Sequence, residues 1–353
     1  MKRFIFAALL LSLTFAVQAQ RLGAINQTLD LGQVTFNRPV TAEFEMINKS
    51  DRDVRIVQAR SSCGCTTVDY PQRLISRDEK FMVSVTYDAR MLGHFHKSVS
   101  LYVDGDDAPV MLVLKGVVVD KVVNYAGDYA YQLGELKADK NNIEFDDVNS
   151  GDMPTARIHI LNPTDKVAQP TVMHLPDYLK AEVSPSKLAP GQGGVVTFSL
   201  DSHALHDYGL TQTNVYLGMN PGERVASNKG IGISAVLLPS FSNLTELDIA
   251  QSPKLHLSTT TLDLGAFGNK KKLKGDIFII NEGNTPLEIN NLQMFTEGIQ
   301  LSLGKRRLEP GEITTLKVTA VAKDLRQARS KPRVLMITND PKRPKETIEI
   351  HVE

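Results

Sequence analysis

The sequence predicts an all-β protein of three consecutive immunoglobulin-like β-sandwich domains after a signal peptide. Short alternating apolar strands recur with turn residues at roughly every eight to twelve positions. The same pattern of residues also occurs three times along the 353 residues. No stretch of about a dozen residues has the periodicity of an amphipathic helix. The chain is longer than one hydrophobic core usually serves, which favours several domains.

Residues 1–19 have the features of a secretory signal peptide. Lys2 and Arg3 are followed by an apolar run and by Val17-Gln18-Ala19, which fits a cleavage site. The apolar run is shorter than a membrane span, and no later stretch is longer, so we expect no transmembrane segment in the mature chain. We expect export to the periplasm or the cell surface, where an oxidising environment favours disulfides.

The repeat is visible in three sets of residues with equal spacings. In each set an aliphatic residue follows a leucine after 7 positions, and an asparagine follows after 19 more. We expect each asparagine side chain to bond nearby backbone and cap a turn at a strand end. The sets are Leu22, Leu29 and Asn48; Leu136, Ile143 and Asn162; and Leu255, Leu262 and Asn281.

A turn follows each asparagine at a nearly constant distance. Pro190-Gly191 and Pro310-Gly311 have the residues of a type II turn, with proline and then glycine at the central positions. The first copy has Arg77-Asp78 instead, which we interpret as a decayed form of this turn. An alternating apolar strand follows each turn and supports the sandwich prediction.

The repeat also sets the expected domain boundaries. Each repeat has about a hundred residues, the size of an immunoglobulin-like domain. A proline-bracketed segment of mixed polar residues precedes the third copy and reads as a linker. The expected domains are 20–119, 120–238 and 254–353, with the linker at 239–253.

Cys63 and Cys65 are the two cysteines of the chain and flank Gly64. On an extended strand both thiols share one face, with Cα atoms about 6.6 Å apart, near the upper limit for a disulfide. Gly64 lets the backbone fold inward, so a bond is feasible. In the chain-entropy model a disulfide that closes a three-residue loop stabilises the folded state by about 1.6 kcal/mol. The pair would therefore contribute little to the stability of the fold.

Four roles stay open for this pair. It can exchange with other thiols, bind a soft metal through two thiolates, clamp a local turn, or be inert. His94 and His96 share one face of an expected strand, and with Cys63 and Cys65 they would complete a site for copper or zinc. The following Lys97-Ser98 instead fits the start of an exposed hairpin.

Two further polar stretches have ordinary structural interpretations. Asp104-Gly105-Asp106-Asp107 lacks the ligand spacing of a calcium loop and fits a hairpin turn better. The basic stretch Asn269–Lys274 fits a solvated loop, with a contact patch for an acidic partner as the alternative.

The composition argues against several functional classes. The chain has 40 basic and 40 acidic residues and no tryptophan, so neither a nucleic-acid footprint nor an aromatic sugar platform is indicated. No nucleophile elbow, phosphate-binding loop or H-E-x-x-H motif is present, and we assign no catalytic residue and no cofactor.

The first repeat resembles the bacterial family DUF1573 over about residues 31–117. The resemblance rests on Cys63-Gly64-Cys65-Thr66-Thr67, on residues 83–88 and 93–99, and on Leu114-Lys115-Gly116. It implies an immunoglobulin-like sandwich related to Hydin and major-sperm-protein type domains. It also implies contact with proteins rather than catalysis, and the family has no established activity.

These observations lead to one main functional hypothesis and two alternatives. The main one is a non-enzymatic exported scaffold that contacts a protein partner through sheet edges and loops. The first alternative is a protein that handles thiols, disulfides or copper with Cys63 and Cys65. The second, by analogy of fold, is a periplasmic chaperone that lends a strand to a client.

Overall fold

The chain folds almost entirely into β-strands, as the sequence predicts. It divides into two compact units, the first containing the chain up to Asn124 with residues 184–186, and the second containing the rest. The expected signal peptide lies outside the described residues. The computed structural model describes residues 22–106, 108–294, 296–325 and 331–353.

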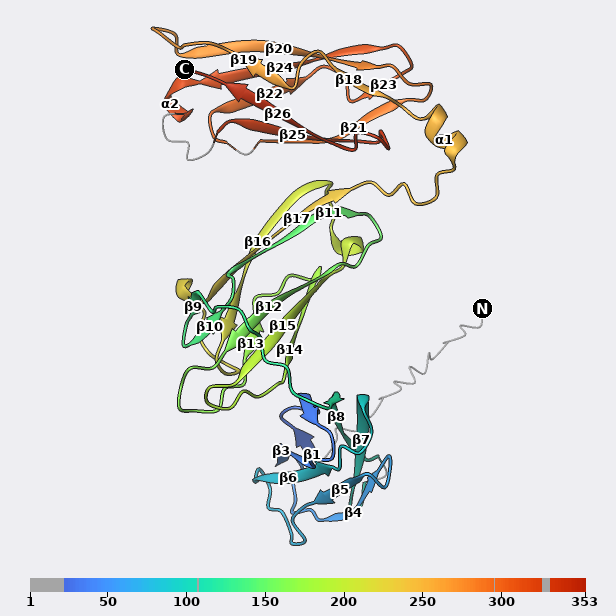
Figure 1. The fold of residues 1–353 in the computed structure, drawn as a ribbon, viewed down its shortest axis with the longest axis vertical. Helices are drawn as coiled ribbons and strands as arrows, with labels where there is room; N and C mark the ends of the chain where they lie inside the picture. Colours follow the sequence, from blue (N-terminus) through green and yellow to red (C-terminus); the bar gives the residue numbers. More distant parts are fainter. Residues whose placement is uncertain (1–21, 107, 295, 326–330) are drawn as a thin grey trace, which may run out of the picture. The chain divides into compact units, whose positions relative to one another are not determined.

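Three immunoglobulin-like sandwiches account for the sheets, and this confirms the predicted fold class (Figure 1). The first unit contains one sandwich and the second contains two. In each sandwich two sheets enclose a separate hydrophobic cluster. The expected boundaries between the domains stay predictions.

The first sandwich joins a sheet of order β1-β3-β6-β5 to one of order β2-β8-β7-β4. Apolar and polar residues alternate along its strands, as in β6, where Phe81, Val83 and Val85 are buried between exposed or half-buried neighbours. Its strands are β1 (Leu22–Ala24), β2 (Thr28–Thr35), β3 (Val40–Asn48), β4 (Ile56–Ser61), β5 (Thr66–Asp69), β6 (Lys80–Tyr87), β7 (Gly93–Val103) and β8 (Val110–Val119).

The second sandwich repeats this arrangement and adds β9 at one sheet edge. Its sheets have the orders β14-β15-β12-β10-β9 and β11-β17-β16-β13. Two single turns of 3-10 helix, Ser202–Ala204 and Ser227–Lys229, lie in its loops. Its strands are β9 (Tyr131–Leu133), β10 (Leu136–Ala138), β11 (Asn142–Asn149), β12 (Thr155–Leu161), β13 (Thr171–Met173), β14 (Leu179–Ser184), β15 (Gly193–Leu200), β16 (Gly209–Gly218) and β17 (Gly230–Leu238).

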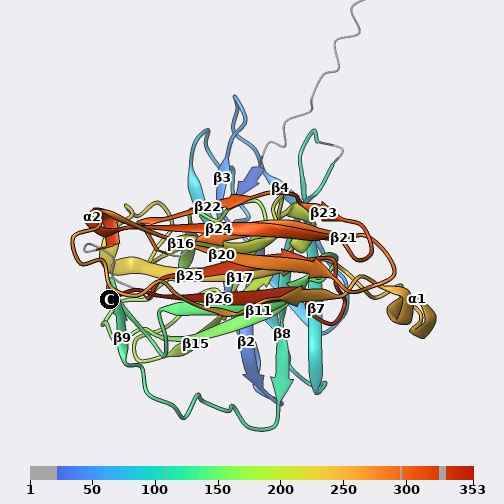
Figure 2. The same cartoon turned by 90° about the horizontal axis from the view of Figure 1, so that it is seen from above.

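The third sandwich has sheets of order β18-β20-β24-β22 and β19-β26-β25-β21-β23. Figure 2 shows β24 and β22 side by side in the first of these sheets. The short helix α2 (Ala322–Leu325) follows β24. The strands are β18 (Leu255–Leu257), β19 (Thr261–Asp263), β20 (Lys272–Asn281), β21 (Leu287–Met294), β22 (Ile299–Leu303), β23 (Arg307–Leu308), β24 (Ile313–Val321), β25 (Arg333–Thr338) and β26 (Lys345–His351).

The pairing of strands explains the repeat in the sequence. In all three sandwiches the second strand of the shared topology pairs in parallel with the last, although most other pairs are antiparallel. The repeated aliphatic residue lies in this parallel pair, and in two sandwiches the repeated leucine faces the asparagine across a strand pair. The partners are Leu29–Leu114, Ile143–Ile233 and Leu262–Ile350, with Leu22–Asn48 and Leu255–Asn281.

The three repeated asparagines are fully buried and cap backbone, as predicted. Asn48 Nδ2 donates to the carbonyls of Arg52, Ile75 and Ser76 at 2.9, 3.0 and 3.1 Å. Its Oδ1 accepts from the amide and the hydroxyl of Ser50. The corresponding carbonyls are Lys166, Leu188 and Ala189 for Asn162, and Thr285 and Leu308 for Asn281.

The predicted type II turn is present in all three copies. Gly191 and Gly311 have φ angles of +71° and +79°, and their amides donate to the backbone carbonyls of Asn162 and Asn281, both at 2.8 Å. Asp78 has φ +60° and donates to the Asn48 carbonyl at 2.9 Å, so the copy that looks decayed keeps the geometry. Aspartate is among the few residues that tolerate this left-handed conformation.

The expected linker contains the short helix α1 (Glu246–Gln251), which the sequence reading missed (Figure 1). The hydroxyl of Thr245 accepts from the amide of Asp248, and the Asp248 carboxylate accepts in return from Thr245. This is a capping box. The spacing Thr-x-x-Asp is visible in the sequence and is the signal that could have located the helix.

Candidate disulfide site

The two cysteines lie where the first sandwich passes from one sheet to the other. β4 is the last strand of the sheet β2-β8-β7-β4, and β5 is the last strand of the facing sheet. The turn between Ser61 and Thr66 connects these two edge strands and carries both sulfurs. The predicted extended strand at this point is therefore wrong, because the chain must change sheets there.

Cys63 and Cys65 form a disulfide with each other, with Cα atoms 5.2 Å apart. The turn brings the Cα atoms closer than the extended estimate of about 6.6 Å, and within the usual range for disulfides. Gly64 has open space where a Cβ would lie and does not adopt a left-handed φ. The turn therefore does not need glycine on steric grounds, contrary to the expectation from sequence.

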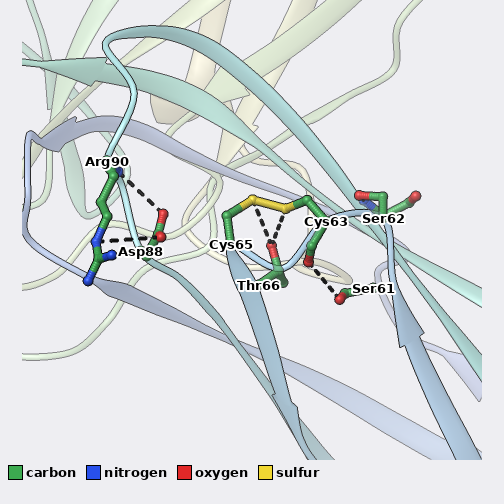
Figure 3. The surroundings of a disulfide bond; sticks show 8 residues. Ser61, Ser62, Cys63, Cys65, Thr66, Asp88 and Arg90 are labelled. Atoms are coloured by element: carbon green, nitrogen blue, oxygen red, sulfur yellow. Dashed lines mark hydrogen bonds and ion pairs between the residues drawn. A yellow bond between two sulfur atoms is a disulfide. The ribbon is translucent and has the colours of Figure 1, made fainter.

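One buried hydroxyl lies beside both sulfurs (Figure 3). The Oγ1 atom of Thr66 is 3.5 Å from Cys63 Sγ and 3.9 Å from Cys65 Sγ. The Cys63 carbonyl accepts from the Ser61 hydroxyl at 2.8 Å. Since a disulfide sulfur carries no proton, the Thr66 hydroxyl is the donor in both contacts.

Hydrogen bonds on both sides hold the turn in place. The Ser62 amide donates to the Ser98 carbonyl at 2.8 Å, and the Ser98 amide donates to the Ser62 hydroxyl at 3.1 Å. On the other side the Asp88 amide donates to the Cys65 carbonyl at 3.1 Å. The turn is thereby tied to β7 and to the loop that follows β6.

The two sulfur-bearing side chains are half-buried but differ in their surroundings. Cys65 packs against the hydrophobic cluster of the first sandwich, next to the buried Thr66. In the neighbouring loop the side chains of Met91 and Leu92 are 73% and 62% exposed. The site therefore combines an accessible disulfide with an exposed apolar loop.

Charges surround the turn on the side of Cys65. Arg90 Nε lies 3.7 Å from Asp88 Oδ2, and Figure 3 shows both residues beside Cys65. The ammonium of Lys97 lies 5.6 Å from the ring centroid of Tyr87, which pairs with Thr66 across β5 and β6. Burial, together with the Asp88 carboxylate, raises the pKa of the Tyr87 phenol, which keeps that group neutral.

The two histidines of the proposed metal site lie on β7. His94 and His96 are both exposed on the face opposite to the buried Phe95, as the predicted strand requires. Within the ranges that the structure describes, no three His, Cys, Asp or Glu side chains gather as a metal-binding group. The copper or zinc site of Cys63, Cys65, His94 and His96 stays a prediction.

The acidic stretch takes the predicted position, and the basic stretch does so only in part. Asp104, Gly105 and Asp106 follow β7 in a hairpin loop, and Asp104 Oδ1 accepts from the Arg55 amide at 2.8 Å. Of the basic stretch, residues 269–271 precede β20, whereas Lys272 and Lys274 lie in that strand with exposed side chains, so the predicted loop is wrong for its second half. Among the described residues, no helix has the length and apolar character that a membrane crossing requires.

The other two sandwiches make the same crossing between sheets without cysteine. β13 and β14 are edge strands of facing sheets, joined by residues 174–178. β22 is likewise an edge strand, and it follows β21 through the residues between Met294 and Ile299. The fold therefore does not require a disulfide at this corner.

Fold and site together define a multi-domain protein of immunoglobulin-like sandwiches with one disulfide turn. Residues 22–118 match the family model of a protein of unknown function, DUF1573, which confirms the resemblance for the first sandwich. Residues 253–353 match the Ig-like domain model of the HYDIN/CFA65/VesB-like type. The comparison with curated proteins gives no match.

Three of the solved structures that match are the following. A protein of unknown function from Porphyromonas gingivalis W83 is 20% identical, with a TM-score of 0.49, over 62% of this chain and 100% of that chain. The ASH/PapD-like domain 7 of human CEP192 is 11% identical, with a TM-score of 0.27, over 34% and 100%. The CupB2 chaperone of Pseudomonas aeruginosa is 12% identical, with a TM-score of 0.21, over 60% and 97%. These likenesses are too remote to indicate a function.

Proposed function

We propose that the protein is a non-enzymatic, exported scaffold that binds a protein partner in the periplasm or at the cell surface. In this proposal residues 20–119, 120–238 and 254–353 are three domains, and 239–253 is the linker. The matches to DUF1573 and to an Ig-like domain model support a binding or scaffold role. The partner would contact the outer faces and loops of the sandwiches.

One exposed face of the third sandwich carries this proposal. On β20 the exposed side chains of Lys272, Lys274, Asp276 and Phe278 share the outer face. Lys317 of β24 lies opposite Asp276 and is exposed on the same face. Phe278 is 49% exposed, and Ile313 on the adjacent β24 is 57% exposed. Three lysines against one aspartate leave this face net positive beside its exposed apolar side chains, which favours a partner surface with apolar and acidic residues.

The test compares partner recovery by variants of the whole chain. Wild type is used to enrich proteins from the exported fraction of the source cells, beside Phe278→Ser/Ile313→Ser and the matched control Leu74→Ser, another half-exposed apolar residue. We expect recovery of a discrete acidic partner to fall about tenfold with the double variant and to persist with the control. Recovery that is unchanged in the double variant would remove this face from the proposal.

A second candidate function is thiol–disulfide exchange at Cys63 and Cys65. The observation that favours it is the internal comparison between sandwiches, since two of the three build this corner without cysteine. A three-residue loop also stabilises little, about 1.6 kcal/mol in the chain-entropy model. The fold does not need this disulfide, and it lies in an accessible turn. Disulfides in such positions are typically the ones that exchange with other thiols.

Cysteine replacement separates the two functions. The scaffold function predicts that Cys63→Ser/Cys65→Ser keeps the partner that wild type recovers. The exchange function predicts that wild type equilibrates with glutathione buffers within the range of an oxidising compartment, as measured by alkylation and intact mass. A disulfide that stays intact in strongly reducing buffer at native pH would exclude exchange.

A further inference from the structure

The disulfide turn and the loop after β6 form a continuous part of the surface of the first sandwich. Thr66 pairs with Tyr87 in the register of β5 and β6, so the turn ends where the loop begins. The bond from the Asp88 amide to the Cys65 carbonyl, 3.1 Å long, continues this contact by one residue. Met91 and Leu92 follow within four residues of that bond.

This loop exposes two large apolar side chains. Met91 and Leu92 precede β7 and are 73% and 62% exposed, among the highest values for large apolar residues of the chain. Ala89, earlier in the same loop, is fully buried and has φ +52°. Adjacent exposed apolar residues are typical of a contact site for another molecule.

The two sulfurs are not equivalent toward an incoming thiol. Cys65 packs on the hydrophobic cluster, and its carbonyl is held by the Asp88 amide. Cys63 is not part of that packing, and its carbonyl is held by the local Ser61 hydroxyl. A molecule attached to Cys63 therefore leaves the core undisturbed, whereas attachment to Cys65 displaces core contacts.

We propose that this surface binds a cysteine-bearing apolar segment of another polypeptide, whose thiolate attacks Cys63 Sγ. The inference rests on the exchange function proposed above. The attack forms a mixed disulfide and breaks the Cys63–Cys65 bond, and Cys65 leaves as a thiolate that takes a proton from water. A second client thiolate then attacks the client sulfur and releases Cys63. The client loses two electrons and the cysteine pair gains them.

The surroundings can stabilise the leaving thiolate and hold the client. The Thr66 hydroxyl lies 3.5 Å from Cys63 Sγ and 3.9 Å from Cys65 Sγ, so it can donate to the Cys65 thiolate but does not distinguish the two sulfurs. The difference between the sulfurs is the packing of Cys65 on the hydrophobic cluster. Lys97, near Tyr87, adds positive charge at this end of the sandwich, whereas the charge of Arg90 is paired with Asp88. The apolar loop holds the client segment, so protein thiols gain a rate advantage over small thiols that do not contact Met91 and Leu92.

The test measures the rates at which the whole chain reacts with three thiols. The probes are glutathione, a short peptide with leucine and valine around one cysteine, and a peptide with serine and glycine in their place. We expect the apolar peptide to form mixed disulfide about tenfold faster than the polar peptide. A cysteine-free version of the apolar peptide should compete with it.

Variants assign the effect to the loop and to one sulfur. Met91→Ser/Leu92→Ser should lower the ratio of apolar-peptide to glutathione rates about tenfold, whereas Leu74→Ser, which is 50% exposed in the loop after β5, should keep the ratio. The two single-cysteine variants are also reacted with an activated peptide disulfide. Cys65→Ser, which keeps Cys63, should react faster than Cys63→Ser, which keeps Cys65.

The outcomes separate this inference from the function on which it rests. Equal rates for all three thiols, without competition, would overturn the docking surface and leave exchange standing. Absence of reaction with every thiol, glutathione included, would overturn both. Faster reaction of Cys63→Ser than of Cys65→Ser would overturn the assignment of Cys63 as the attacked sulfur.

Discussion

The buried asparagine of the first sandwich offers the sharpest test of how the fold is held together. Replacing Asn48 by alanine removes three donated and two accepted hydrogen bonds at a site with no exposure to solvent. These bonds join the end of β3 to the chain around Ile75 and Ser76. Their loss should destabilise the first sandwich without changing the surfaces proposed for binding.

The magnitude follows from the number of bonds and from the partners that remain. A neutral hydrogen bond contributes about 1 kcal/mol net. The Ile75 carbonyl keeps the Val54 amide as a donor at 3.0 Å, which reduces the cost. We expect Asn48→Ala to lower the free energy of unfolding by about 3 kcal/mol, which is about a 100-fold change in the unfolding constant.

Hydrogen exchange read by mass spectrometry in a urea series would measure this effect sandwich by sandwich. With a slope of about 1.5 kcal/mol per molar urea, the midpoint for peptides of the first sandwich should fall by about 2 M. Peptides around Asn162 and Asn281 are internal controls and should not shift. A loss below about 0.5 kcal/mol in the first sandwich would refute the reasoning.

The aspartate variant of the same residue tests the polarity of the site. In Asn48→Asp a carboxylate oxygen replaces the group that donates to three carbonyls, and burial with these acceptors raises the folded-state pKa of the carboxyl. A folded pKa above the unfolded value means that stability is fully present below about pH 3.9 and is lost as pH rises through the folded pKa. The variant should therefore be less stable than Asn48→Ala at pH 7 and should recover in acid.

The remaining predictions concern two glycines and one repeated turn position. Gly64→Ala should keep the disulfide and change stability by less than about 0.5 kcal/mol, by intact mass and thermal unfolding, because the new Cβ meets no atom within 4 Å. Gly191→Ala, at φ +71°, should destabilise the second sandwich by about 1 kcal/mol in the urea series. Hydrogen bonds from Arg73 and the Ser76 amide lower the pKa of Glu79, and those from Lys305 and the Glu309 amide lower the pKa of Glu312. Lowered folded pKa values give stability that is present above the unfolded pKa and lost as pH falls, so the first and third sandwiches should lose this contribution in acid. Gln192 holds this position in the second sandwich and does not titrate, so peptides that cover its turn should show no such loss. Equal acid responses of the three turns in hydrogen exchange would contradict this.

Local chemistry made the fold predictable from the sequence. The spacing of Asn48, Asn162 and Asn281 predicted three copies of one sandwich. The spacing recurs because each asparagine donates hydrogen bonds to backbone carbonyls near its own strand end and in the following turn. The pairs Pro190-Gly191 and Pro310-Gly311 predicted the turn because proline and glycine fix its two central φ angles. Alternation of apolar residues predicted the strands for the same local reason.

Features that depend on the order of strands in the sheets were not predictable. The turn at Cys63 and Cys65 exists because β4 and β5 belong to facing sheets. No local sequence pattern predicts that assignment of strands to sheets. The contact between the disulfide turn and the loop that carries Met91 and Leu92 depends on the register between β5 and β6. The sequence identified the cysteines as the site of interest, but it did not show the apolar loop beside them.

The burial of Asn48 has a practical consequence for making the protein. Asn48-Lys49-Ser50 matches the acceptor sequence for N-linked glycosylation, a modification that adds a bulky surface group. A glycan added to this amide before folding would occupy a position with 0% exposure, and the first sandwich could not fold around it. Secretion from a eukaryotic host would therefore yield misfolded chains. Ser50→Ala removes the acceptor sequence and keeps the asparagine with its three carbonyl contacts.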